Sequence, residues 1–423
     1  MTVLDKKKCK QNDACALSMA MRLLCTMKNI GIVVHGVETC SNGYANINSL
    51  MKLVNNEKTL ILSTDLLNED LIVGSLHKLE EAVRNLASIT SNPIFVLNTC
   101  GPAIIGDDIS ALISSLEKQI PNALYLINSE GIAYSQYYLI YKTIASKVAE
   151  RFQVNTQKFN KELLLITHCH TGIEDIKAII KLLYPFDIKP VFFPYYYDMD
   201  RRIIPQYNAY ICQSIGKRFA DVMNDKLMTK TVSITVPVGI GNTNKWLMDI
   251  GKTFNCVEKV EYVIRCQMNR YKKELDIIKQ KLKGKKVLIT GGPGSVLPIV
   301  DLCMDLGMED LFIGLLYTDE IVNIDGRDLS NLKIISNIQF NEIKALIENN
   351  SIDIFFGQHG SYSYINSTCI PFIPLSCNWS SHIGYENLIK IGRRILLLIN
   401  TYKESIYGQC NNFLRKENEN LSK

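Results

Sequence analysis

The sequence predicts an α/β fold of three Rossmann-like domains, each with a doubly wound parallel sheet, around a central cleft. Short runs of β-branched residues alternate with amphipathic segments of helical length through almost the whole chain. A length of 423 residues, 47% hydrophobic and 21% charged, suffices for two or three cores. Because such sheets bind ligands at the carboxyl ends of their strands, the informative residues directly follow each apolar run.

The first domain is expected over residues 1–158. IGIVVH (30–35) and PIFVLN (93–98) are predicted to be buried strands, because both are short apolar runs that end at polar residues. VGSLHKLEEAVRNLAS (73–88) has the apolar spacing of a helix and lies between them. A second helix is expected at ISALISSLEKQI (109–120).

The middle domain is expected over residues 159–256 and the third over residues 257–423. The middle domain has predicted strands at 163–167, 189–193, 209–212 and 232–237, and predicted helices near 172–184, 214–227 and 242–254. The third has a charged connecting helix at 257–283, then strands KKVLITGG, DLFIGLLY, KIIS and IDIFFG, helices IVDLCMDLG and FNEIKALIEN, and a closing helix GYENLIKIGRRILLLINTYKE.

Composition excludes several functions. The net charge is only +5 and no basic face is evident, so nucleic acid is not an expected partner. No apolar run approaches the roughly 18 residues of a membrane span, and the N-terminus lacks a signal peptide's apolar core, so a cytoplasmic protein without a membrane partner is expected. Thirteen cysteines, an odd number spread over a long chain, fit metal or redox chemistry better than a disulfide scaffold, although most should be small buried hydrophobes.

Three cysteines lie at the edges of predicted elements. Cys15 opens the helix CALSMAMRLLCTM, Cys40 lies in the loop HGVETCSNG after a strand, and Cys100 follows the strand PIFVLN. Thiolates favour iron–sulfur clusters or zinc, but the tight CxxC spacing of many such sites is absent. A shared metal site and three buried thiols are therefore both open on spacing alone.

The segments around these cysteines resemble, in order, three signature segments of nitrogenase component 1 and its relatives. They are HGVETC, STDLLNEDLIVGSLHKLEEAV and NTCGPAIIGDDI. The matching residues are Cys15; His35, Gly36 and Cys40; Thr64, Asp65, Leu66, Glu69, Asp70 and Gly74; and Thr99, Cys100, Ile105, Gly106, Asp107 and Asp108. The resemblance continues to IGYENL near the end and is greatest to alpha-type chains, which include the catalytic subunit and the scaffold on which its cofactor matures.

The resemblance implies an iron–sulfur cluster, of four-iron or double-cubane type, at a subunit interface. Cys15, Cys40 and Cys100 would be this chain's share of the ligands, with the rest on a homologous chain or a second copy. Electrons would come from an ATP-dependent iron protein. Gly106, Asp107 and Asp108 are then expected to shape and cap the helix that follows, rather than to act in acid–base chemistry.

The catalytic half of the family pattern is less complete. Cys212 stands where the family's cofactor cysteine stands, and Gln136 is retained. The cofactor histidine is replaced by Ser376, with Cys377 beside it and His382 six residues further on. The family's arginine-rich loop is GGPGSVLP (291–298) here, without a charge, and the neighbourhood of Tyr141 lacks another family histidine. A multiply anionic cofactor would lose its positive surroundings, so the standard dinitrogen-reducing cofactor is not expected.

Two further motifs follow predicted strands. GGPGSV follows a strand and opens a helix, but it fails the GxGxxG spacing of a dinucleotide loop. In HCHTG, His168 and His170 share a face of an extended segment while Cys169 points away, so either a polar loop or a soft-metal or acid–base group is open. His170, Cys212, His359 and Cys377 all follow predicted strands and could line a central cleft.

Three functions follow from the resemblance. The first is a nitrogenase component 1-like oxidoreductase subunit that moves low-potential electrons through its cluster. The second is a non-catalytic scaffold for assembly of the iron–molybdenum cofactor, with a precursor metal cluster at Cys212. The third is a tetrapyrrole reductase of the nitrogenase-like group, in which the cleft binds a tetrapyrrole and needs no cofactor thiolate.

Overall fold

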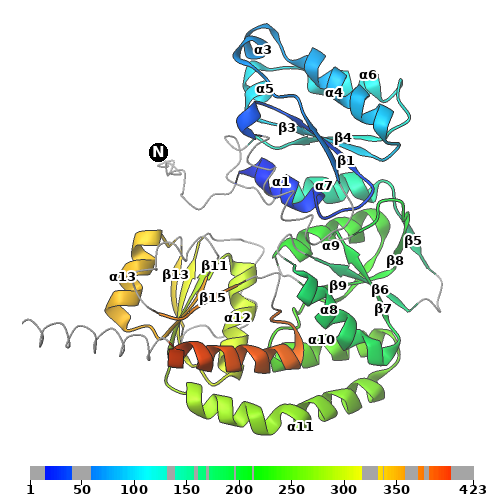
Figure 1. The fold of residues 1–423 in the computed structure, drawn as a ribbon. Coiled ribbons are helices and arrows are strands. Elements are labelled where there is room, and N and C mark those ends of the chain that lie inside the picture. The colour runs from blue at the N-terminus through cyan, green and yellow to red at the C-terminus, as the bar shows by residue number, and fades with distance from the viewer. Residues whose placement is uncertain are drawn as a thin grey trace, which may run out of the picture. The chain divides into compact units, whose positions relative to one another are not determined.

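The computed structural model contains parallel sheets covered by helices (Figure 1). The structure describes residues 15–40, 59–130, 139–156, 161–167, 171–194, 197–211, 214–316, 332–336, 338–357, 370–375 and 381–401. The chain divides into two compact units. The N-terminal unit comprises residues 1–169, 189–211 and 215–231, and the C-terminal unit comprises 170–188, 212–214 and 232–423.

The first sheet has four parallel strands in the order β2-β1-β3-β4. The strands are β1 (Gly31–His35), β2 (Leu60–Ser63), β3 (Ile94–Asn98) and β4 (Leu124–Asn128). The helices of this region are α1 (Ala16–Leu24), α3 (Asn68–Val73), α4 (Leu76–Ile89), α5 (Cys100–Ile105), α6 (Ile109–Leu116) and α7 (Leu139–Ala149). All residues of the two central strands β1 and β3 are buried, as their continuous apolar runs require.

Helices cover both faces of this sheet. α4 and α6 lie on one face and α1 and α7 on the other (Figure 1). On the first face, Leu79, Val83 and Leu86 of α4 form a core with Val33 and Val96 of the sheet. A Cβ on Gly31 would lie 2.9 Å from a Leu86 methyl carbon, so glycine is what allows this close approach of helix and strand.

The second sheet has the order β10-β9-β6-β7, and β6 pairs in parallel with both β7 and β9. Its strands are β6 (Glu162–Ile166), β7 (Lys189–Phe193), β9 (Tyr207–Tyr210) and β10 (Lys230–Ser233), and a small sheet pairs β5 (Gln153–Asn155) with β8 (Ile203–Pro205). The helices of this region are α8 (Ile173–Leu183), the 3₁₀ turn η1 (Tyr184–Phe186), α9 (Ser214–Leu227) and α10 (Ile240–Thr253).

The third sheet has five parallel strands in the order β13-β12-β11-β14-β15. They are β11 (Lys286–Gly291), β12 (Asp310–Leu315), β13 (Lys333–Ser336), β14 (Ile354–Gly357) and β15 (Phe372–Pro374), and the helices are α11 (Val257–Leu282), α12 (Pro293–Asp305), α13 (Phe340–Asn350) and the helix 384–401. Counted within the domain, this order is 3-2-1-4-5, the Rossmann arrangement. Ile343 and Ile347 of α13 pack on Leu288 and Phe355 of the sheet.

The predicted α/β class with parallel sheets is confirmed. Several boundaries were wrong. The predicted helix 73–88 is interrupted at Gly74, whose φ of +99° ends α3, and α4 begins only at Leu76. β10 ends at Ser233 rather than 237, because the chain leaves the sheet and Val238 pairs with Ile383. No helix in the described ranges is both long and apolar enough to cross a membrane.

Candidate functional site

The strand order of the first sheet creates a switch point between β1 and β3. β2 lies on one side of β1, and the chain then crosses to β3 on the other side, with His35 opposite Asn98 at the carboxyl ends. Helical connections from neighbouring strands diverge at such a point and leave a crevice outside the carboxyl edge, where α/β sheets bind ligands. The segments that carry Cys40 and Cys100 leave the sheet at this edge.

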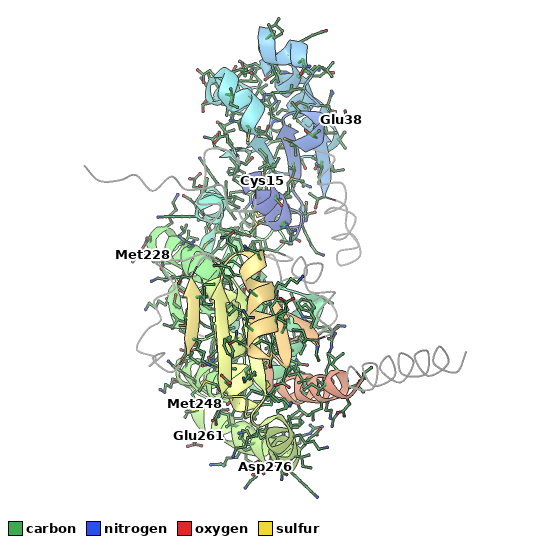
Figure 2. All side chains as sticks on the ribbon, turned by 90° about the vertical axis from the view of Figure 1, so that its left-hand side faces the viewer. Cys15, Glu38, Met228, Met248, Glu261 and Asp276 are labelled. Carbon is green, nitrogen blue, oxygen red and sulfur yellow. The ribbon has the colours of Figure 1, made fainter. Side chains whose placement is uncertain are left out.

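The three cysteines that are predicted to be ligands lie in helices, or next to them, in the N-terminal unit. Cys15 is the N-cap residue of α1 and is exposed (Figure 2). Residues 38–40, which include Cys40, are helical, and Cys100 is the first residue of α5; both cysteines are half-buried. None of the three forms a disulfide with another described cysteine.

The three sulfur atoms interact electrostatically. Burial raises the pKa of the Cys40 thiol, and the negative charges of the Cys100 and Cys15 thiolates raise it further. Hydrogen bonds from the Thr99 hydroxyl and the Val37 backbone act in the opposite direction, by stabilising the thiolate. Because both neighbouring charges act on Cys40, the three thiols share one region.

This donor set does not fit one metal ion. Among the residues that the structure describes, no three His, Cys, Asp or Glu side chains are grouped closely enough to bind a single ion. A multi-iron cluster makes a different demand, since each thiolate binds its own iron. Soft sulfur donors around one region, with Cys15 exposed on the outer side, therefore fit a cluster shared with another chain better than a closed zinc site.

A buried hydrogen-bond network surrounds the predicted site. The His35 ring is fully buried, with Nδ1 3.2 Å from Thr64 Oγ1 and Nε2 3.0 Å from Ser75 Oγ. Asp107 Oδ2 accepts hydrogen bonds from Ser75 N, at 2.9 Å, and from Ser75 Oγ. Burial lowers the pKa of His35 to about 4, although the Asp107 charge acts in the opposite direction, so the imidazole is neutral at pH 7.

Glycine is required next to this network. A Cβ on Gly36 would lie 2.3 Å from Thr99 Oγ1, so a side chain there would push the two cysteine-bearing segments apart. Gly36 N instead donates to Thr64 Oγ1 at 3.0 Å, and Leu66 N donates to Gly36 O at 2.9 Å.

The acidic motif residues have structural contacts. Asp108 caps α6 as predicted, since its Oδ1 accepts from Ala111 N at 3.0 Å, but Asp107 binds Ser75 instead of the helix. Sequence reasoning missed Ser75 altogether; its position after Gly74 in the second signature segment was the only available signal.

The motif residue Asp70 stabilises α3. Its Oδ2 accepts from Leu67 N and from Lys78 Nζ, both at 2.7 Å. Hydrogen bonds from Lys78 and from the Leu67 backbone hold the pKa of the carboxyl below its usual range.

An apolar patch lies on α3 and α5, beside Cys100. α3 contacts α5, and four large side chains of these segments are more than half exposed: Leu67, Ile72, Val73 and Ile104. Ile72 is 83% exposed and Ile104 is 72% exposed. Apolar clusters of this kind on otherwise polar surfaces mark contact sites for other proteins.

The predicted residues of the catalytic half fall mostly outside the described part of the chain. Cys212, Gln136, His170, Cys377, His168, Cys169, His359 and Ser376 all lie outside the described residues. β6 ends at Ile166 and the neighbouring β9 at Tyr210, so the segments of His170 and Cys212 follow the two strands at the switch point of the second sheet.

Two other positions of that half are described. Tyr141 is buried on α7 and its ring packs edge-on against Phe219, at 6.0 Å between centroids. His382 is buried, and burial together with the nearby Arg394 charge lowers its pKa to about 4. In the loop GGPGSVLP, a Cβ on Gly291 would lie 2.4 Å from a Leu375 methyl carbon, so packing against Leu375 requires this glycine.

Several known proteins are similar to this chain over most of its length. The nitrogenase molybdenum-iron protein alpha chain of Methanothermobacter marburgensis is 23% identical over 362 residues, covering 79% of this chain and 73% of that protein. The nitrogenase iron-molybdenum cofactor biosynthesis protein NifE of Rippkaea orientalis is 22% identical over 402 residues, covering 90% and 83%. The solved structure of nitrogenase Cp1 at pH 5 has a TM-score of 0.76 at 17% identity, covering 93% of this chain and 89% of that chain, which supports the fold.

Residues 15–400 match the model of the family described as nitrogenase component 1 type oxidoreductase. This match begins at Cys15 and includes every strand of the described residues. The chain therefore belongs to the nitrogenase component 1 type oxidoreductase family.

Proposed function

We propose that this chain is one subunit of a nitrogenase component 1-like oxidoreductase. It receives low-potential electrons from an ATP-dependent iron protein, through an iron–sulfur cluster that it shares with a homologous chain or a second copy. The observation that carries the proposal is the electrostatic interaction of Cys15 and Cys100 with Cys40 at the switch point of the first sheet. When bound, the cluster supplies one-electron redox chemistry at this edge.

The residues of the chain have separate tasks in this proposal. Cys40 and Cys100 are held by the carboxyl edge of the sheet, and the Thr99 hydroxyl stabilises the Cys40 thiolate. Cys15 is exposed on α1 and so remains accessible to the partner chain that completes the ligand set. Three thiolates cannot complete a four-ligand cubane, which is why the partner is part of the proposal.

The experiment that tests the ligands compares cysteine variants after anaerobic purification with the partner chain. Cys40→Ala and Cys100→Ala should each abolish the interfacial electron paramagnetic resonance signal and reduce the iron content. Cys266→Ala is the matched control, because Cys266 is an exposed free cysteine on α11. Full iron content and an unchanged signal in Cys100→Ala would refute the assignment.

We expect the electron donor to bind at the apolar patch of α3 and α5. An electron donor must approach the cluster closely, and the patch includes Ile104 of the helix that begins with Cys100. Ile72→Asp should weaken binding of the iron protein and slow electron transfer without loss of iron. Ile89→Asp is the control, since Ile89 is 64% exposed on α4 of the same unit. Equal binding by both variants would exclude this surface.

A scaffold for iron–molybdenum cofactor assembly is the second candidate. The similarity to NifE over 90% of this chain and the uncharged loop around Gly291 both favour it. In this case Cys212 would bind a transferable metal-cluster precursor. A scaffold should pass that precursor to an acceptor protein and show no turnover with an iron protein, ATP and reductant, whereas the oxidoreductase should consume reductant.

A further inference from the structure

The hydrogen atoms of the buried network can be placed from its donors and acceptors. Ser75 has one hydroxyl hydrogen, and it is donated to Asp107 Oδ2, which also accepts from Ser75 N. Ser75 Oγ can therefore only accept from His35 Nε2, 3.0 Å away, so Nε2 carries the hydrogen. In a neutral imidazole Nδ1 is then an acceptor, and the one hydroxyl hydrogen of Thr64 can be donated to it, at 3.2 Å, or to Gly36 O, at 3.3 Å.

This arrangement excludes a nucleophilic serine at Ser75. In a Ser-His-Asp triad the histidine accepts the serine hydrogen and the carboxylate binds the other ring nitrogen. Here the carboxylate of Asp107 binds the serine itself, and Ser75 has no exposed surface. The serine, histidine and aspartate therefore form a structural network.

The network joins the segments that carry two of the proposed ligands. His35 ends β1 and precedes the Cys40 loop, Ser75 precedes α4, and Asp107 follows α5, the helix that begins with Cys100. The ring of His35 thus connects the Cys40 segment, through Ser75 and Asp107, to the far end of the Cys100 helix.

The backbone of His35 makes a second connection between the same two segments. Its carbonyl oxygen accepts from Thr99 N at 3.1 Å and from Thr99 Oγ1 at 2.8 Å. Thr99 directly precedes Cys100, and its one hydroxyl hydrogen can be donated either to the His35 carbonyl or to the Cys40 sulfur. Movement of His35 would therefore change the surroundings of both sulfur atoms.

We infer that His35, locked as the neutral Nε2–H tautomer by Ser75 and Asp107, is a positioning residue that sets the geometry of Cys40 and Cys100. The effect of His35 on the cluster ligands rests on the proposed function, whereas the tautomer of His35 does not depend on that function. Residues that orient metal ligands through hydrogen bonds typically change metal affinity by about 10- to 100-fold when they are replaced.

The first test measures the tautomer in the metal-free full-length chain. Ring nitrogen shifts of ¹⁵N-histidine distinguish the two tautomers, and His35→Gln identifies the His35 signals among the six histidines. The wild type should show Nε2–H at pH 7. Asp107→Asn should keep it, because a carboxamide oxygen can still accept from Ser75, whereas Asp107→Ala should give a mixture. An Nδ1–H tautomer in the wild type would overturn the inference.

The second test measures iron affinity and the electron paramagnetic resonance spectrum of the complex with the partner chain. His35→Leu and Asp107→Ala should lower iron affinity about 10- to 100-fold in chelator competition and broaden the signal. His35→Gln should restore both, because its amide can donate to Ser75. If His35→Leu does not fold, the iron affinities and spectra of Asp107→Ala and Asp107→Asn are compared instead. Wild-type affinity and spectrum in the folded variants would overturn the positioning role, whereas retained iron in Cys40→Ala would instead refute the proposed ligands.

Discussion

Two ionisable residues of the C-terminal unit, the buried His382 and the half-buried Asp175, should have opposite effects on the free energy of unfolding as the pH changes. Burial lowers the pKa of His382 from 6.5 to about 4. Burial raises the pKa of Asp175 from 3.8 to about 6, although Ser381 Oγ and Gly172 N donate hydrogen bonds to its two carboxyl oxygens. Each difference exceeds two pH units, and one unit corresponds to about 1.4 kcal/mol.

The signs follow from which state binds the proton more tightly. Between pH 6.5 and 4 the unfolded chain protonates His382 and the folded chain does not, so stability falls by about 3 kcal/mol as pH falls. Between pH 6 and 3.8 the folded chain protonates Asp175 and the unfolded chain does not, so stability rises as pH falls. For Asp175, about 3 kcal/mol is an upper bound, because the residue retains some solvent exposure.

The perturbations are His382→Gln and Asp175→Asn, measured against the wild type by urea unfolding from pH 7 to pH 4. Trp246 is buried on α10 of the C-terminal unit, so its fluorescence reports this unit. As pH falls, His382→Gln should gain stability relative to the wild type and Asp175→Asn should lose it. About 3 kcal/mol corresponds to roughly 1 M in the urea midpoint, for an m value of about 3 kcal/mol/M.

The control is Asp276→Asn, because Asp276 is an exposed carboxylate on α11 of the same unit (Figure 2). Its difference from the wild type should not change with pH. The reasoning would be refuted if the difference in unfolding free energy from the wild type did not change with pH for either test variant. It would also be refuted if the difference changed in the same direction for both.

Three further substitutions test local contacts. Gly36→Ala should destabilise the N-terminal unit by about 1–3 kcal/mol in thermal unfolding, through the clash with Thr99 Oγ1, and an unchanged midpoint would show that the segments can separate freely. Asp108→Ala removes the bond to Ala111 N and should cost about 1 kcal/mol; faster hydrogen exchange confined to the start of α6 would identify the cap. Asn122→Ala removes two bonds to backbone carbonyls, at 2.7 and 2.8 Å, and should cost about 2–4 kcal/mol, with no loss arguing that water replaces the amide.

Strands that form separate apolar runs in the sequence were predicted more reliably than strands that do not. Buried β1 and β3, and the isolated runs of β7 and β13, differ from the predicted ranges by one residue at most. The missed strands are β2, β4, β5, β8 and β15. β2 is half-buried and β15 has only three residues, so their sequences carry a weaker apolar signal than the central strands.

The candidate site divides in a similar way. The cysteines were proposed as ligands because each follows or opens a predicted element, which is a local property of the sequence. Ser75 and its contact with Asp107 were missed, because the two residues are 32 positions apart in the sequence. They come within hydrogen-bonding distance only when α3, α4 and α5 have folded. The assignment of Asp107 to a helix cap was the local alternative, and its neighbour Asp108 fills that position.

The order of the cysteines along the chain has a consequence for biosynthesis. All three precede residue 101, and the sheet that positions two of them is complete at Asn128. Because N-terminal domains fold first on the ribosome, we expect the thiols to come together while most of the chain is still being made. The yield of iron-containing protein should then depend more on the redox conditions during translation than on those after release, which pulse labelling under changing oxygen would reveal.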